Sequence, residues 1–378
     1  MNAGSSSVPP PHIALTFVAI AFVTLVGTSV WTLVAAVAPL ALLHALAVGV
    51  FLMVAMGLLY QFVPVVAMSP LRFRHLPLLH AAIATSGTLC IVIGFQNAAF
   101  GVVRAGGDLA LAGLGIELFV LVATVLRGRP PLPVRGALLA LVWLCLAMAT
   151  GIWMAGSLAH DTRPGTLMRY HAVFGLIGFF ATIITAITFR LLRMFERVNR
   201  ERRTLVFTIG SSVVAVALAS GIVLGEYLAV ALAGLFCMEM ALIALSRNPA
   251  YQPETLAYSA VSAVAVLAAA LCSVDGLAGP AVAIMLWLFI GTAVIGYVQR
   301  IVPFIWWIAR SHREGARNIP TLGEMNHSAL GYCILFAWVF AGLGWLFWPQ
   351  THIAAAFSLV ACGALAMQLS RPFLLQKN

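Results

Sequence analysis

The stretch Leu126-Arg127-Gly128-Arg129-Pro130 ends the first of three similar blocks in this 378-residue chain. A long apolar run stops there at arginines and a proline. Two more apolar runs end in the same way, about 120 residues apart, at Leu245-Ser246-Arg247-Asn248-Pro249 and at Leu369-Ser370-Arg371-Pro372. Self-similarity at a fixed period indicates an architecture that repeats one structural unit. We therefore predict three repeats, at about 13–130, 135–250 and 255–374.

Each block is long enough for four membrane-spanning helices. The chain is 62% hydrophobic and 8% charged, and about 20 apolar residues in a helix cross about 30 Å of hydrocarbon. Twelve such runs follow one another, at 13–37, 40–66, 77–101, 107–126, 135–158, 165–193, 204–224, 226–246, 255–275, 280–308, 326–347 and 351–371. The sequence thus predicts an all-α integral membrane protein: a single transmembrane domain over 1–378, with twelve transmembrane helices in three four-helix repeats. We expect 1–12 to be disordered.

The net charge of +10 is distributed unevenly over the predicted loops. Of 21 lysines and arginines, the N-terminus and the loops after odd-numbered helices hold only Arg104, Arg163 and Arg169. By the positive-inside rule, both termini are cytoplasmic and the chain is a multi-pass protein of the cell inner (plasma) membrane. The basic ends then contact anionic membrane lipid, and no nucleic-acid partner is expected.

Two further polar features bear on the prediction. Glu117 and Glu239 fall within predicted spans, where an unpaired carboxylate is costly. Such carboxyls either relay protons or neutralise a cation, or else form a hydrogen bond between helices. The glycine pair in Gly106-Gly107-Asp108 is interpreted as a turn before the fourth helix.

Four of the nine histidines begin hydrophobic helices. They are His44 in the second span, His80 in the third, His171 in the sixth and His327 in the eleventh. An ionisable side chain within a membrane span is a functional candidate by default, because burying it without a partner is unfavourable.

His171 heads a stripe of small residues on one helix face: Gly175, Gly178, Thr182 and Thr185. A tetrapyrrole coordinated through a histidine needs such a smooth wall, and helical bundles build cofactor sites from facing side chains. The alternative is that the small residues let helices pack closely, with the histidine hydrogen-bonded across the interface.

Depth sorts the four histidines into two pairs. In the predicted topology His44 and His171 lie near the outer face, roughly 6–9 Å into the membrane, whereas His80 and His327 lie near the inner face. The outer pair is predicted to ligate a haem iron or a copper ion. Two pairs at opposite faces suit two haems b, or one haem and one copper. For the inner pair, the alternative is a pair of solvated interfacial histidines.

Twelve helices in three blocks, with a histidine near the outer start of the second helix and another in the sixth, resemble the haem-copper oxidase subunit I superfamily. The string His44-Ala-Leu-Ala-Val-Gly-Val-Phe-Leu-Met-Val-Ala-Met-Gly-Leu-Leu-Tyr-Gln-Phe-Val-Pro64 is similar to the corresponding segment of the NnrS-type family. Those are haem- and copper-containing membrane proteins associated with nitric oxide stress. The resemblance implies that His44 matches the low-spin haem ligand and that His171 matches a ligand of the active-site copper.

The chain departs from the oxidase pattern in two places. Its seventh helix has no His-His pair, and its tenth, from Ala281 to Trp307, contains no histidine. The usual binuclear centre cannot be assembled, so a terminal oxidase is not predicted. Haem b is then held by other pairings, of which His44 with His171 is the simplest. Met285 is an outside candidate for a ligand, against a role in apolar packing.

The function predicted is a haem-binding or haem/copper membrane protein in electron transfer, respiration or the nitric oxide response, with an electron-transfer protein as partner. The alternative is a twelve-helix secondary transporter without a cofactor. The loop Ala67–His75 lacks the acidic residue typical of major facilitators, and the repeat period is not half the chain. Both observations favour the haem interpretation.

Overall fold

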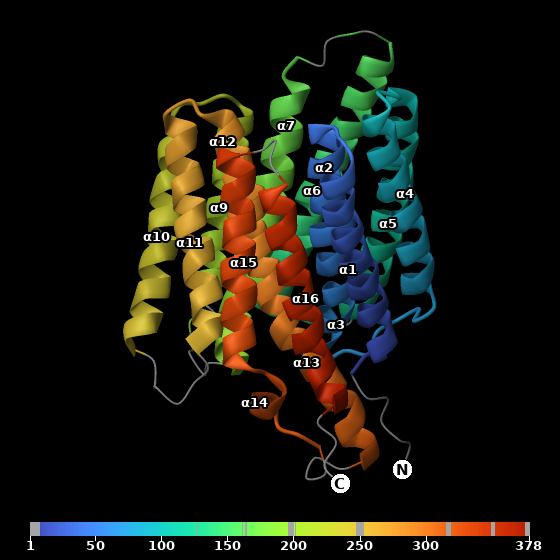
Figure 1. The fold of residues 1–378 in the computed structure, drawn as a ribbon, viewed down its shortest axis with the longest axis vertical. Helices are drawn as coiled ribbons and strands as arrows, with labels where there is room; N and C mark the ends of the chain where they lie inside the picture. Colours follow the sequence, from blue (N-terminus) through green and yellow to red (C-terminus); the bar gives the residue numbers. More distant parts are fainter. Residues whose placement is uncertain are drawn as a thin grey trace. The chain divides into compact units, whose positions relative to one another are not determined.

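The computed structural model describes residues 8–126, 128–160, 162, 165–195, 200, 202–246, 253–314, 319–348 and 352–374. These residues form helices and no strand (Figure 1). This is the expected outcome for spans rich in apolar residues, because a lone helix satisfies its own backbone hydrogen bonds in hydrocarbon. The chain is therefore an all-α, multi-pass membrane protein, and exposed apolar side chains such as Val23, Leu89 and Phe119 contact lipid.

The chain separates into two compact units. The first contains the residues up to Thr24 and Val37–Leu232, and the second contains Leu25–Ala36 and the chain from Ala233 onward. The helices of the first unit are α1 (Pro11–Val34, in its first part), α2 (Pro39–Leu46), η1 (Ala47–Leu52), α3 (Met53–Ala67), α4 (Leu76–Gln96), α5 (Phe100–Val125), α6 (Leu132–Ala159), α7 (Leu167–Val173), η2 (Phe174–Ala181), α8 (Thr182–Phe195), α9 (Arg203–Ala219) and α10 (Leu224–Ser246, in its first part). Those of the second unit are the rest of α1, the rest of α10, α11 (Pro253–Val274), α12 (Ala278–Ala283), η3 (Ile284–Gly291), α13 (Thr292–Glu314), α14 (Leu322–Met325), α15 (Ser328–Phe347) and α16 (Ile353–Leu374).

Eleven helices of the described chain are long and apolar enough to cross a membrane. They match eleven of the predicted spans, most of them to within a few residues at each end. The remaining prediction, 204–224, corresponds to α9, an apolar helix of 17 residues. That length is at the lower limit for crossing the hydrocarbon core.

Three of the spans contain a π-helix, in which hydrogen bonds run from residue i to i+5. The π-helices η1, η2 and η3 interrupt the spans Pro39–Ala67, Leu167–Met194 and Ala278–Ser311. These three spans are about two-thirds buried or more, whereas less than half of each other span is buried. The helices that carry π-segments therefore form the cores of their units.

The interpretation of Gly106-Gly107-Asp108 as a turn is wrong. All three residues lie inside α5, which begins at Phe100. The physical reason is helix packing: a Cβ added at Gly106 would lie 2.7 Å from the carbonyl oxygen of Gly87 on α4, and one added at Gly87 would lie 2.8 Å from that of Gly106. The glycines let two helix backbones touch, as small residues do in membrane bundles.

The predicted ends of several helices and of the N-terminal segment also need correction. At the third arginine-proline exit, Pro372 lies inside α16, and Pro303 likewise lies inside α13. Proline ends a helix only where a lost hydrogen bond has no substitute, and packed membrane helices tolerate it. The first exit follows the end of α5, whereas Arg247–Pro249 lies outside the described residues. Of the segment 1–12, residues 1–7 also lie outside them, and Pro11 already begins α1.

Candidate functional site

The structure brings the predicted outer pair of histidines together in the first unit. His44 lies on α2, three residues before η1, and His171 lies on α7, three residues before η2. Their imidazole ring centres are 6.1 Å apart, and the two ring planes differ by only 17°. Two separate core helices thus present their histidines at the same place and with matching orientation.

Both rings are held by backbone carbonyl groups. The Nδ1 atom of His44 lies 2.8 Å from the carbonyl oxygen of Leu40, and that of His171 lies 2.8 Å from the carbonyl oxygen of Ala147 on α6. A carbonyl oxygen can only accept, so each Nδ1 carries the hydrogen, and in the neutral ring each Nε2 keeps a free lone pair. This is the arrangement that orients histidine ligands of metals in proteins.

The separation of the ring centres is short enough for both rings to reach one metal ion. An ion bound to an imidazole nitrogen lies about 2 Å from that nitrogen, so two imidazoles that share an ion have ring centres at most about 6 Å apart. No group of three or more His, Cys, Asp or Glu that could hold a metal occurs in the described part of the chain. A pair of histidines is, however, sufficient for haem, since the porphyrin supplies four nitrogen ligands itself.

Aromatic and glycine residues complete the surroundings of the pair. The Phe95 ring on α4 stacks on His44, with ring centres 4.5 Å apart and planes at 29°. A Cβ added at Gly151 on α6 would lie 2.8 Å from Nδ1 of His171. Glycine at position 151 is therefore what allows this imidazole to lie against α6.

Of the small residues that follow His171 on its helix face, only the first, Gly175, has free space in front of it. A Cβ added at Gly175 would meet nothing closer than 3.9 Å, but Gly178 is covered by the Trp143 side chain, 2.8 Å from an added Cβ. Thr182 and Thr185 are buried, and the Thr185 hydroxyl donates to carbonyls of its own helix. The flat wall that we predicted is thus limited to the turn next to the histidine.

The two histidines of the predicted inner pair belong to different units, and each is described by itself. His80 belongs to the first unit and is 2% exposed, with its Nδ1 atom 3.0 Å from the Tyr60 hydroxyl. His327 belongs to the second unit, lies just before α15 and is exposed. Its backbone N–H donates to Oε1 of Gln368 at 3.3 Å. Met285 lies buried in η3 of the second unit, so a role as ligand stays a prediction.

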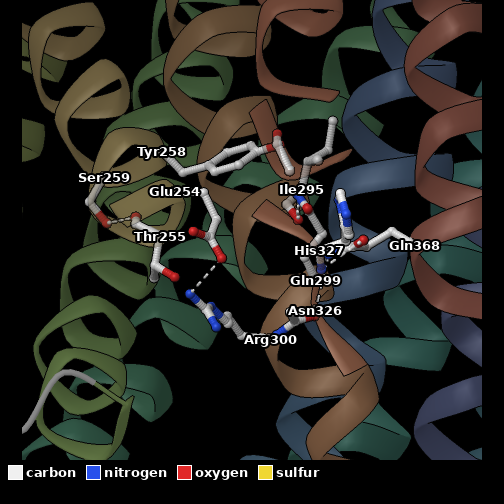
Figure 2. A network of polar contacts seen from close by, with 11 residues as sticks. Glu254, Thr255, Tyr258, Ser259, Ile295, Gln299, Arg300, Asn326, His327 and Gln368 are labelled. Atoms are coloured by element: carbon white, nitrogen blue, oxygen red, sulfur yellow. Dashed lines mark hydrogen bonds and ion pairs between the residues drawn. The ribbon is translucent and has the colours of Figure 1, made fainter. Parts of the chain in front are cut away.

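Sequence reasoning missed a polar network in the second unit (Figure 2). Glu254 of α11 and Arg300 of α13, both buried, form an ion pair at 3.4 Å. In the amide orientation that suits its neighbours, Asn326 accepts from Arg300 at 3.2 Å and donates to the Gln299 carbonyl at 3.1 Å. The network fixes the segment that precedes α15 onto α13, which the ion pair in turn joins to α11. A signal existed in the sequence, since Gln299-Arg300 is a polar pair inside an apolar run.

The fold and the pair of histidines define a class: a multi-pass helical membrane protein with two facing imidazoles in its core. No family model matches the chain, and no curated protein is significantly similar to it. The function is therefore argued from the site itself.

Proposed function

We propose that this chain is a haem b-binding membrane protein of the electron-transfer type, in which His44 and His171 are the two axial ligands. The observation that carries the proposal is the pair of near-parallel imidazoles 6.1 Å apart, each anchored through Nδ1. Haem supplies reversible one-electron chemistry when bound, and its axial ligands and their hydrogen bonds tune the potential.

The protein's own part in this function is to hold and orient. The carbonyls of Leu40 and Ala147 keep both Nε2 atoms available and oppose rotation of the rings. Phe95 covers one face of His44, and Gly151 leaves space for the His171 ring. If His44 and His171 both held a haem iron, the protein would supply two ligands, and such a site would favour electron transfer over binding and activation of a small molecule.

The proposal includes one haem per chain, with copper as the alternative metal at the same pair. We include no second cofactor in the proposal, because the Nδ1 atom of His80 already contacts Tyr60 and its Nε2 edge faces α5 at Gly113. His327 is exposed, and its hydrogen bond with Gln368 comes from the backbone N–H and not from the ring.

We further propose three four-helix repeats and a place in the NnrS-type family, with an electron-transfer protein as partner in respiration or the nitric oxide response. Each predicted block has its π-helix in its second span, beginning at Ala47, Phe174 and Ile284. In the first block Gly57 packs against Phe17 of the block's first helix, and in the third Gly296 packs against Tyr258 in the same way. These recurrences support the repeat, in which α9 is the seventh of twelve spans. The distribution of the arginines supports cytoplasmic termini and the inner membrane as the location.

A reduced-minus-oxidised absorbance spectrum of the purified protein tests the haem proposal. We expect the bands of a six-coordinate haem b, at about one haem per chain. His44→Ala and His171→Ala should each remove most of this signal while the protein stays monodisperse. His352→Ala is the matched control, since His352 is an exposed histidine in the second unit and should leave the spectrum unchanged.

A colourless protein after expression with sufficient haem would contradict the proposal and favour the cofactor-free transporter. Retention of the full spectrum in both His44→Ala and His171→Ala would show that the two residues are packing histidines, as the alternative for the glycine stripe assumes.

A further inference from the structure

A second polar cluster lies in the core of the first unit, apart from the pair of histidines. It consists of Tyr60 on α3, His80 on α4 and Glu117 on α5, whose exposed fractions are 0%, 2% and 0%. The Tyr60 hydroxyl lies 3.0 Å from Nδ1 of His80. The ring of Phe17 packs against both, with its centre 5.2 Å from that of His80 and 5.7 Å from that of Tyr60.

The other edge of the His80 ring faces the helix that carries Glu117. A Cβ added at Gly113, one turn before Glu117 on α5, would lie 2.8 Å from Cδ2 of His80 and 3.3 Å from its Nε2. Glu117 also lies close enough to Tyr60 to interact with its hydroxyl electrostatically. The glycine thus lets an imidazole approach the helix next to a buried carboxyl group.

Glu117 is the residue that packing alone does not explain. Both of its carboxyl oxygens are fully enclosed, and neither has a hydrogen-bond partner among the described residues. A buried polar group without a partner is unfavourable, and a buried carboxylate without a counter-charge is more so. An ionisable group at such a position within a membrane span is usually kept because a proton or an ion uses it.

We propose that Tyr60, His80 and Glu117 form a proton-binding site inside the membrane, which takes up and releases one proton. With the proton bound, Glu117 is a neutral carboxylic acid and His80 is a neutral imidazole. Because neither Glu117 oxygen has a hydrogen-bond partner among the residues that the structure describes, transfer of that proton to Nε2 of His80 requires a rotation of the Glu117 side chain or a bridging water. The transfer leaves a carboxylate beside an imidazolium and keeps the net charge at zero. Loss of the proton from the cluster changes its charge by −1.

Tyr60 allows either ring nitrogen of His80 to carry the hydrogen. A hydroxyl can donate or accept, so its hydrogen bond with Nδ1 of His80 can run in either direction. When Tyr60 donates to Nδ1, Nε2 carries the hydrogen and can stabilise a Glu117 carboxylate. When Nδ1 donates to Tyr60, Nε2 is free to receive the carboxyl proton. The imidazole can therefore offer a tautomer that suits either charge state of Glu117 once the carboxyl group turns toward it.

Infrared spectroscopy tests this proposal without using any activity. A protonated carboxyl group gives a C=O stretching band separate from those of the amides, and this band shifts when the proton exchanges for deuterium. We expect wild-type protein transferred from H₂O to D₂O to show such a shifting band, and Glu117→Gln to lose it completely. Tyr60→Phe and His80→Ala should each move the band, because both substitutions change the polarity of the carboxyl group's surroundings.

Glu239→Gln is the matched control, since Glu239 is equally buried but lies in the second unit. The band assigned to Glu117 should stay in this variant. A spectrum in which Glu117→Gln keeps the band, or in which Tyr60→Phe and His80→Ala both leave it unmoved, would overturn the proposal. His44→Ala separates this proposal from that of the haem: it should lose the haem spectrum and keep the carboxyl band.

Discussion

At the scale of single residues, the two anchored imidazoles differ from ordinary packing histidines in one respect. A packing histidine uses its ring nitrogens to satisfy neighbouring groups across an interface. Here the Nδ1 atoms of His44 and His171 each bond a backbone carbonyl, and among the described residues no hydrogen bond involves either Nε2 atom. The sequence predicted this pairing from the depth of the two residues, because both begin a span on the same side of the membrane.

Glycine at position 151 provides a sharp test of this arrangement. Gly151→Ala adds a methyl group 2.8 Å from both Nδ1 and Cε1 of His171, so the ring must move and its bond to Ala147 weakens. We expect reduced haem content and a loss of stability of about 1–3 kcal/mol, as for other overpacked sites. Haem absorbance per protein and thermal unfolding in detergent measure the two effects.

Gly115→Ala is the control for this substitution, because an added Cβ at Gly115 of α5 would meet no atom within 4 Å. It should leave both quantities unchanged. If Gly151→Ala behaves like this control, the His171 ring is free to move and is not a fixed ligand.

The role of Tyr60 could not be predicted from the sequence. A tyrosine in an apolar helix carries no local signal of its partner, and its contact with His80 exists only because α3 and α4 pack together. Glu117 was singled out by its charge, but whether it has a hydrogen-bond partner depends on residues distant in sequence. Tertiary packing decides both questions.

At the scale of helices, hydropathy predicted most of the spans, whereas the π-helices were missed. A π-helix has the composition of its neighbours, and its wider hydrogen bonding is selected by packing and not by a local sequence signature. Each of η1 and η2 begins three residues after a histidine, whereas the residue three before η3 is Ala281. The wider turn shifts the register of the helix, so it decides the direction in which the preceding histidine points.

A deletion of one residue within η1, such as Val48, should convert the π-turn to α-helix. Because one residue corresponds to about 100° of an α-helix, His44 would then rotate away from His171 relative to the rest of its span. We expect loss of the haem spectrum in a protein that is still inserted and monodisperse. Spectroscopy and size-exclusion chromatography measure the outcome.

The matched control is deletion of Leu288 within η3, because the residue three positions before η3 is Ala281 and not a histidine. That variant should keep its haem. Equal loss of haem in both deletions would mean that the π-helices act in folding and not in aiming the ligand.

At the scale of the whole molecule, the number of spans decides the orientation of every loop. Eleven helices are clear candidates, and α9 is short. If α9 crosses the membrane, the loop around Ile222 lies on the outer side, together with the loop around Thr162. If α9 does not cross, Ile222 lies on the cytoplasmic side and the two termini lie on opposite sides.

Cysteine labelling in intact cells distinguishes these arrangements. The native cysteines lie within apolar spans, where a charged, membrane-impermeant maleimide reacts poorly because it requires a solvated thiolate. Exposed loop positions provide the probes: Thr162→Cys and Ile222→Cys should both react from outside the cell, whereas Met68→Cys should react only after permeabilisation.

Labelling of Met68→Cys in intact cells would show that the protein has the opposite orientation to the one that the arginines predict. Reaction of Thr162→Cys without reaction of Ile222→Cys would remove α9 from the set of spans, and with it the three equal blocks. The pairing of His44 with His171 would survive that result, because both residues lie on spans that precede α9.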